Sequence, residues 1–162
     1  EKGFREFKEC GLIKKVPKMI CVQAAGCSPI YNAFISGKDE VERIVKPNTL
    51  AHGIENALPP SGNQVLRMLK WNNGLCVSVT DEEIINAQAT LARTGLFLQP
   101  ESATTLAAVK KLKKEKHFRD DEKVLCVLTG SGLKYTASFE RHELKHYTCK
   151  LDEMDGVLGS RQ

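Results

Sequence analysis

The stretch LCVSVTDEEIINAQATLARTG, residues 75–95, decides the fold class of this chain. It opens with an apolar run at 75–79, and such continuous apolar character is typical of a parallel strand covered on both faces. Thr80 and Glu83 then form a capping box, in which each side chain accepts from the other residue's backbone N–H. Apolar residues at helical spacing follow: Ile84, Ala87, Leu91 and Ala92. Gly95 is placed to end that helix, so a strand leads directly into a helix, which indicates an α/β protein.

The rest of the chain repeats this alternation. Apolar runs at 18–24 and 123–128 predict two more buried parallel strands. Helices are predicted over 64–70 and from Pro100 onward, because proline suits the first turn of a helix. We therefore expect a three-layer open sheet of mostly parallel strands with helices on both faces. The turn-rich stretch 26–60 is expected to form short helices and loops at one rim of the sheet.

Composition limits the classes of protein to which this chain can belong. Its 162 residues fit about one domain, and its formal net charge of +4 is too small to predict a nucleic-acid partner. No apolar run is long enough for a membrane span. The six cysteines contain no CxxC pair, and we expect free, mostly buried thiols in a reducing cytoplasm. The first methionine is Met19, so we expect the sequence to be a piece of a longer protein.

Three motifs suggest chemistry. Thr129-Gly130-Ser131-Gly132 directly follows the run at 123–128, and ligands of open α/β sheets bind at the carboxyl ends of strands. The HELKH sequence at 142–146 matches the zinc motif HExxH, but lacks a clear third ligand, and an exposed charged helix is the favoured interpretation. The lysines between 110 and 116 are interpreted as a solvated helix end. We assign no catalytic residue and no metal ligand from these patterns.

Taken in order, several segments of residues 1–135 resemble the threonine synthase family. The matching strings are GFREF at 3–7, PKM at 17–19, VQAAGCSP at 22–29, PNTLA at 47–51, TDEEI at 80–84, LAR at 91–93, QPESA at 99–103 and LTGSGLK at 128–134. The resemblance implies the pyridoxal-phosphate fold shared with the tryptophan synthase β chain. It also implies that residues 1–135 are the carboxy-terminal part of that enzyme domain, with 136–162 as a charged, partly loose extension.

By the same resemblance, pyridoxal phosphate is the cofactor and Thr129 places its hydroxyl against the pyridine nitrogen. A neutral hydroxyl moderates the electron sink, which suits elimination and replacement reactions. Gly53, in the loop 50–54, is the second candidate for contact with the cofactor, and Ala24 and Ala25 are expected near the same ring.

Several positions depart from the family pattern. Gln99 stands where many members carry Glu, Tyr135 stands where many carry Asp, and His52-Gly53 differs from the common loop. The family's Schiff-base lysine and its glycine-rich phosphate loop belong to an N-terminal segment without a counterpart here. We therefore expect a fragment of a threonine synthase-like enzyme, inactive alone, whose partners are the missing half and an amino-acid substrate.

Alternative functions remain open at this stage. The complete enzyme could be a serine/threonine dehydratase or a sulfo-amino-acid synthase of the same fold, and could form a homodimer. A non-catalytic module that binds an anion or nucleotide at 129–132, or a decayed copy without activity, would have a similar sequence.

Overall fold

The computed structural model describes residues 1–119, 121–135 and 148–159. Strands β1 (Ile20–Ala24) and β2 (Leu75–Val79) pair in parallel, so the first two predicted strands are confirmed. Cys21 lies opposite Cys76, and Ala24 lies opposite Val79. Both strands therefore end at the same edge of the sheet, which is the edge where ligands bind in open α/β folds.

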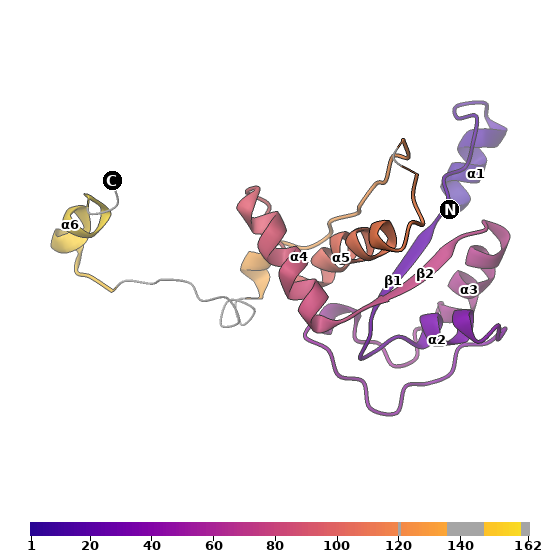
Figure 1. The fold of residues 1–162 in the computed structure, drawn as a ribbon, viewed down its shortest axis with the longest axis horizontal. Helices are drawn as coiled ribbons and strands as arrows, with labels where there is room; N and C mark the ends of the chain where they lie inside the picture. Colours follow the sequence, from indigo (N-terminus) through magenta and orange to yellow (C-terminus); the bar gives the residue numbers. More distant parts are fainter. Residues whose placement is uncertain (120, 136–147, 160–162) are drawn as a thin grey trace.

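Helices cover both faces of this strand pair (Figure 1). On one face, α2 (Pro29–Ile35) and α3 (Gly62–Trp71) pack through Ile30 and Leu69. On the other lie α4 (Asp81–Arg93) and α5 (Pro100–Lys114). The expected three layers are confirmed. The remaining elements are α1 (Lys2–Glu9), η1 (His52–Ile54), η2 (Gly132–Lys134), η4 (Leu151–Glu153) and α6 (Met154–Gly159).

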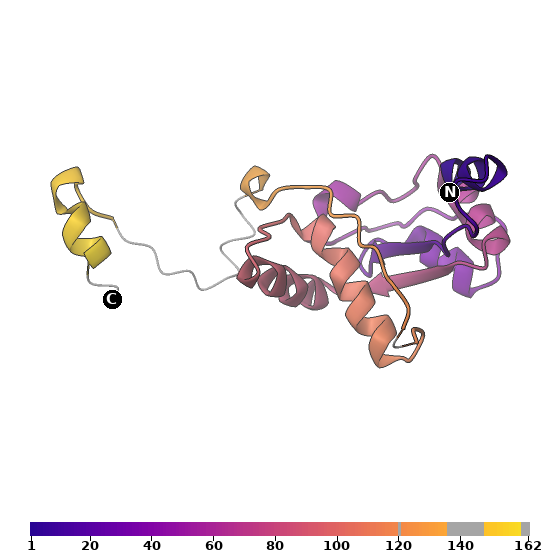
Figure 2. The ribbon, with the colours of Figure 1, turned by 90° about the horizontal axis from the view of Figure 1, so that it is seen from above.

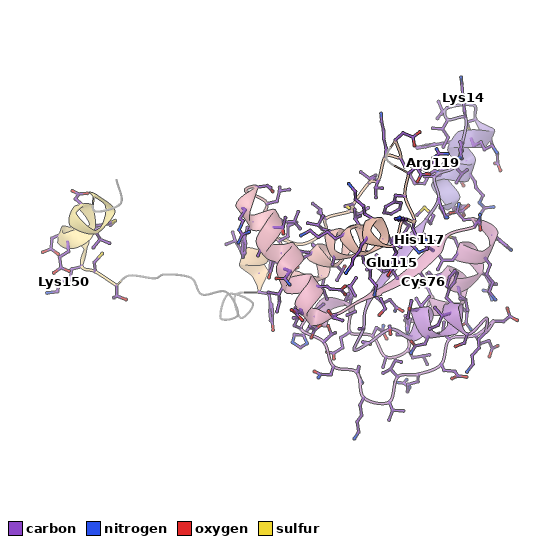
Figure 3. The ribbon with its side chains drawn as sticks, viewed as in Figure 1. Lys14, Cys76, Glu115, His117, Arg119 and Lys150 are labelled. Atoms are coloured by element: carbon purple, nitrogen blue, oxygen red, sulfur yellow. The ribbon has the colours of Figure 1, made fainter. Side chains whose placement is uncertain are left out.

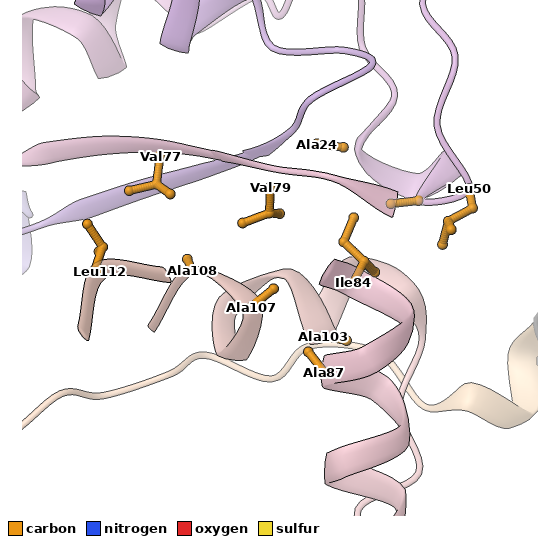
Figure 4. Close-up of a cluster of buried hydrophobic side chains, with 11 residues drawn as sticks. Ala24, Leu50, Val77, Val79, Ile84, Ala87, Ala103, Ala107, Ala108 and Leu112 are labelled. Atoms are coloured by element: carbon orange, nitrogen blue, oxygen red, sulfur yellow. The ribbon is translucent and has the colours of Figure 1, made fainter. Parts of the chain in front are cut away.

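The main core lies between β2 and the helix pair α4–α5 (Figure 4). Its centre is made of small and β-branched side chains, which let the helices approach the sheet closely. The buried members are Ala24, Leu50, Ala51, Val77, Val79, Ile84, Ala87, Ala103, Ala107, Ala108 and Leu112. Ala51 brings the loop before η1 into this core, so the loop is fixed beside the carboxyl end of β1.

Helix α4 begins as the sequence predicts. The Glu83 N–H donates to Thr80 Oγ1 at 3.2 Å, and the Thr80 N–H donates to Glu83 Oε2 at 2.7 Å. Gly95 adopts φ +85° just after the helix, a conformation that favours glycine. The inner face differs from the prediction at two positions, because Ala92 is exposed and Gln88 is buried. The Gln88 amide is satisfied there by donating to the Leu98 carbonyl at 2.7 Å.

The prediction of a third strand at 123–128 is wrong for this structure. The chain passes through these residues without joining the described sheet, and Leu125 and Val127 are 84% and 65% exposed. The segment runs back alongside α5, from the end of that helix to its beginning (Figure 2). A strand needs a neighbouring strand edge to satisfy its backbone groups. The apolar residues at 123–128 favour a strand, but no strand among the described residues pairs with them.

The carboxyl end of α5 carries the basic run as a largely solvated surface. Lys110, Lys113 and Lys114 are exposed, whereas the Lys111 ammonium reaches back and donates to the Ser78 carbonyl at 2.8 Å. Beyond the helix the Glu115 and His117 side chains lie 3.5 Å apart in the following turn (Figure 3). The interpretation as a helix end is confirmed.

The HExxH motif at 142–146 lies outside the described residues, as does most of the expected extension at 136–162. Within that extension the short helix α6 follows η4, so part of the segment expected to be loose is helical. In the part of the chain that the structure describes, no helix is long and apolar enough to cross a membrane.

Candidate functional site

Three segments distant in the sequence meet at the beginning of α5. They are the first turn of α5 itself, the loop containing η1, and the residues 129–135 that include η2. The carboxyl ends of β1 and β2 lie behind them, because Ala51 packs in the same core as Ala24 and Val79. This arrangement forms one rim at the sheet edge where the sequence predicts a ligand.

Ser102 holds the segment that carries Thr129. This serine is 1% exposed, and its hydroxyl oxygen accepts from the Gly130 N–H at 2.7 Å and from the Thr129 N–H at 3.2 Å. The Gln99 N–H donates to the Gly130 carbonyl at 3.0 Å and secures the segment from its other side. A Cβ on Gly130 would meet the end of the Gln99 side chain, which would have to move to make room for it. Thr129 itself stays exposed, with its hydroxyl 3.4 Å from Ser102 Oγ.

Glu101 links η1 to the same turn of α5. The Gly53 N–H donates to Glu101 Oε1 at 2.7 Å. The other carboxylate oxygen, Oε2, is buried and has no partner among the described residues. A carboxylate at the start of a helix is favoured by the helix dipole, but an unsatisfied buried oxygen has a cost. The rim therefore holds one acceptor available to a donor from a ligand.

Two residues that depart from the family pattern contact each other. The rings of His52 and Tyr135 meet edge to face, with centroids 5.8 Å apart and an interplanar angle of 78°. Glu55 Oε2 lies 3.1 Å from His52 Nδ1. The ring contact joins η1 to the end of η2.

The loop before η1 is anchored by Asp81, the first residue of α4. The Thr49 hydroxyl donates to Asp81 Oδ1 at 2.6 Å, and the Leu50 N–H donates to Asp81 Oδ2 at 3.0 Å. Thr49 is 1% exposed, so its end of the hydrogen bond to Asp81 is buried in the protein interior. Sequence reasoning places Asp81 only in a helix cap and misses its role in positioning η1.

The structure thus brings two of the three predicted cofactor contacts to one place. Thr129 and Gly53 are both held by the first turn of α5, through the neighbouring residues Ser102 and Glu101. Ala25 lies at the end of β1, exposed, with its N–H donating to the Val79 carbonyl at 2.7 Å. The supporting residues Ser102 and Glu101 follow Pro100 in the first turn of α5, but their contacts with 129–130 and Gly53 become visible only in the fold.

These residues fit the ring of pyridoxal phosphate. Thr129 is an exposed residue whose neutral hydroxyl suits a pyridine nitrogen. Glu101 Oε2 offers an acceptor that nothing else in the described chain uses. The described residues contain no group of three or more His, Cys, Asp or Glu side chains that could hold a metal ion.

Comparison with known proteins is consistent with this geometry. A family profile described as "Pyridoxal-phosphate dependent enzyme" matches residues 2–130. Threonine synthase from Methanocaldococcus jannaschii is 40% identical over 134 residues, which are 82% of this chain and 33% of that protein. "Threonine synthase 2, chloroplastic" from Arabidopsis thaliana is 34% identical over 93% of this chain and 30% of its own length. The chain therefore spans about a third of the length of these relatives.

A solved structure supports the fold independently. Serine racemase from Dictyostelium discoideum aligns with a TM-score of 0.58 and 26% identity, over 80% of this chain and 38% of that one. The resemblance to threonine synthases and the pyridoxal-phosphate fold are both confirmed.

Proposed function

Since the chain belongs to the pyridoxal-phosphate dependent enzyme family, we propose that it is the carboxy-terminal part of a threonine synthase-like enzyme. The complete protein would convert O-phosphohomoserine and water into threonine and phosphate. The observation that supports this most directly is the position of Thr129, an exposed residue held by the first turn of α5, which also holds Gly53.

The cofactor supplies an electron sink for chemistry at the carbon atoms of a bound amino acid. The residues of this chain would form one side of the site that holds it. Thr129 would donate to the pyridine nitrogen, and Ser102 would fix the backbone of Thr129 so that the hydroxyl keeps its place. Gly53 and Ala25 would form the adjoining wall. The hydroxyl stays neutral, so it would not hold a proton on the ring nitrogen as a negatively charged carboxylate can.

The remaining parts of the site are proposed to come from a segment outside residues 1–162. By family resemblance that segment carries the lysine that binds the cofactor and the loop that binds its phosphate. We infer that residues 1–162 alone do not turn over substrate, that the enzyme is cytoplasmic, and that it can form a homodimer when complete. Six free cysteines support a reducing compartment.

The test uses the full-length enzyme and its Thr129→Val variant. Valine keeps the branched shape and removes the hydroxyl, so affinity for pyridoxal phosphate should fall about 5- to 10-fold, as for one lost hydrogen bond. Thr90→Val, on the outer part of α4, is the matched control and should leave affinity unchanged. Equal affinity in both variants would refute the role of Thr129.

Product analysis tests the reaction itself. Formation of threonine from O-phosphohomoserine supports the proposal, whereas formation of 2-oxobutyrate from threonine would indicate a dehydratase. For residues 1–162 alone, we expect no covalent capture of pyridoxal phosphate. Attachment at one specific lysine of this chain would overturn the division of the site between two segments.

A further inference from the structure

Two cysteines lie directly opposite each other in the sheet. Cys21 of β1 and Cys76 of β2 are register partners, and neighbouring strands are about 4.8 Å apart. Side chains at paired positions of parallel strands point to the same face, so both thiols emerge on one side. Disulfides bridge Cα atoms about 4.4–6.8 Å apart, so this spacing allows a bond between the two sulfurs.

The pair belongs to the second apolar cluster, under α2 and α3. Cys76, labelled in Figure 3, is 8% exposed and is a buried member of this cluster, whereas Cys21 packs against the cluster and is only partly buried. The other four cysteines occupy different sites: Cys10, Cys27, Cys126 and Cys149. The described residues provide no third ligand for a metal ion here.

We propose that Cys21 and Cys76 form an oxidisable dithiol, which hydroperoxides convert into a disulfide between β1 and β2. The chemistry balances without another reactant. The Cys21 thiolate attacks one peroxide oxygen and breaks the O–O bond, giving a sulfenic acid and an alkoxide or hydroxide, which takes up the proton that Cys21 released on ionising and leaves as an alcohol or water. The Cys76 sulfur then displaces hydroxide from the sulfenic acid and gives up its own proton, so that one water leaves. Two thiols are oxidised and one peroxide bond is reduced.

The environment assigns the first step to Cys21. The Cys76 thiol donates a hydrogen bond to Cys21, which lowers the pKa of Cys21 below its usual value despite burial. The same bond, together with burial, raises the pKa of Cys76. The thiolate is the reactive form of cysteine, so the more accessible partner is also the more reactive one.

This site is separate from the proposed cofactor rim. Val77 and Val79 of β2 face the α4–α5 core, whereas Cys76 faces α2 and α3. Oxidation should therefore proceed whether or not the protein binds pyridoxal phosphate. A result that refutes the proposed function therefore leaves the dithiol proposal intact, and a result that refutes the dithiol leaves the proposed function intact.

Peptide mapping of the whole protein tests the dithiol. The protein is treated with hydrogen peroxide at low concentration, remaining thiols are alkylated, and a tryptic digest is analysed by mass spectrometry without reduction. We expect peptide 19–38, which contains Cys21, to be linked to peptide 71–93, which contains Cys76. The linked form should melt several degrees higher than the reduced form, because the bond restricts the unfolded chain.

Variants identify the sulfur atoms involved. Peptide 19–38 also contains Cys27, so Cys27→Ser is the matched control and should still give the linked peptide. Cys21→Ser should abolish the linkage while keeping the circular dichroism of the wild type. The proposal is overturned if the linked peptide is absent from the oxidised wild type, or if it persists in Cys21→Ser.

Discussion

Replacing Ser102 with alanine removes the group that holds the segment 129–130 on α5. Two backbone N–H groups, those of Thr129 and Gly130, lose their common acceptor, the hydroxyl of a serine that is 1% exposed. A buried donor left without an acceptor costs about 1–3 kcal/mol. The Gly130 contact at 2.7 Å is the better formed, so most of this cost is expected there.

Hydrogen exchange of individual amides measures that loss where it occurs. A cost of about 1–3 kcal/mol should accelerate exchange of the Gly130 amide roughly 5- to 150-fold, since about 1.4 kcal/mol corresponds to a factor of ten. Amides in β2, which does not depend on Ser102, should change much less. Urea unfolding of the same variant measures how much of this local cost appears in the free energy of global unfolding.

The matched control is Ser36→Ala at the exposed end of α2. It removes the same hydroxyl from a solvated position, and should change stability by less than about 0.5 kcal/mol. If the Gly130 amide exchanges at the wild-type rate in Ser102→Ala, then Ser102 does not hold the segment. The positioning of Thr129 would then need another explanation.

Three further changes test separate parts of the structure. Thr80→Ala breaks the capping box of α4 and should destabilise the protein by about 1 kcal/mol in urea unfolding, so an unchanged midpoint would contradict the cap. Ile84→Ala empties a fully buried site and should cost about 2–5 kcal/mol, whereas Ile35→Ala, at a position 61% exposed, should cost far less; equal losses would place the core elsewhere. The hydrogen bond and charge of Lys70 hold the pKa of Asp39 below its usual 3.8, so Lys70→Met should raise that pKa in an NMR titration. Because the folded-state pKa is lowered, the favourable contribution of this exposed pair is present above the ordinary pKa and is lost as pH falls through the lowered one.

The candidate site was only partly predictable. Thr129 could be proposed because it lies in a stretch that resembles a family motif, and Gly53 because its loop occupies the place where the family packs backbone against the cofactor. Ser102 and Glu101 could not be assigned their roles, since these depend on which backbone N–H groups the folded chain brings to them. The contact between His52 and Tyr135 joins residues more than 80 positions apart in the sequence, and no local sequence pattern predicts it.

By itself the sequence determined the elements that local physics controls. The strand at 75–79, the capping box at Thr80 and the proline start of α5 depend on side-chain spacing and on hydrogen bonds a few residues apart. Only the tertiary structure decided the fate of 123–128, which has the composition of a strand but lies along α5 without a strand beside it. The reason is physical: periodicity and caps are short-range properties, whereas a strand, a buried Gln88 and a shared rim all require partners distant in the sequence.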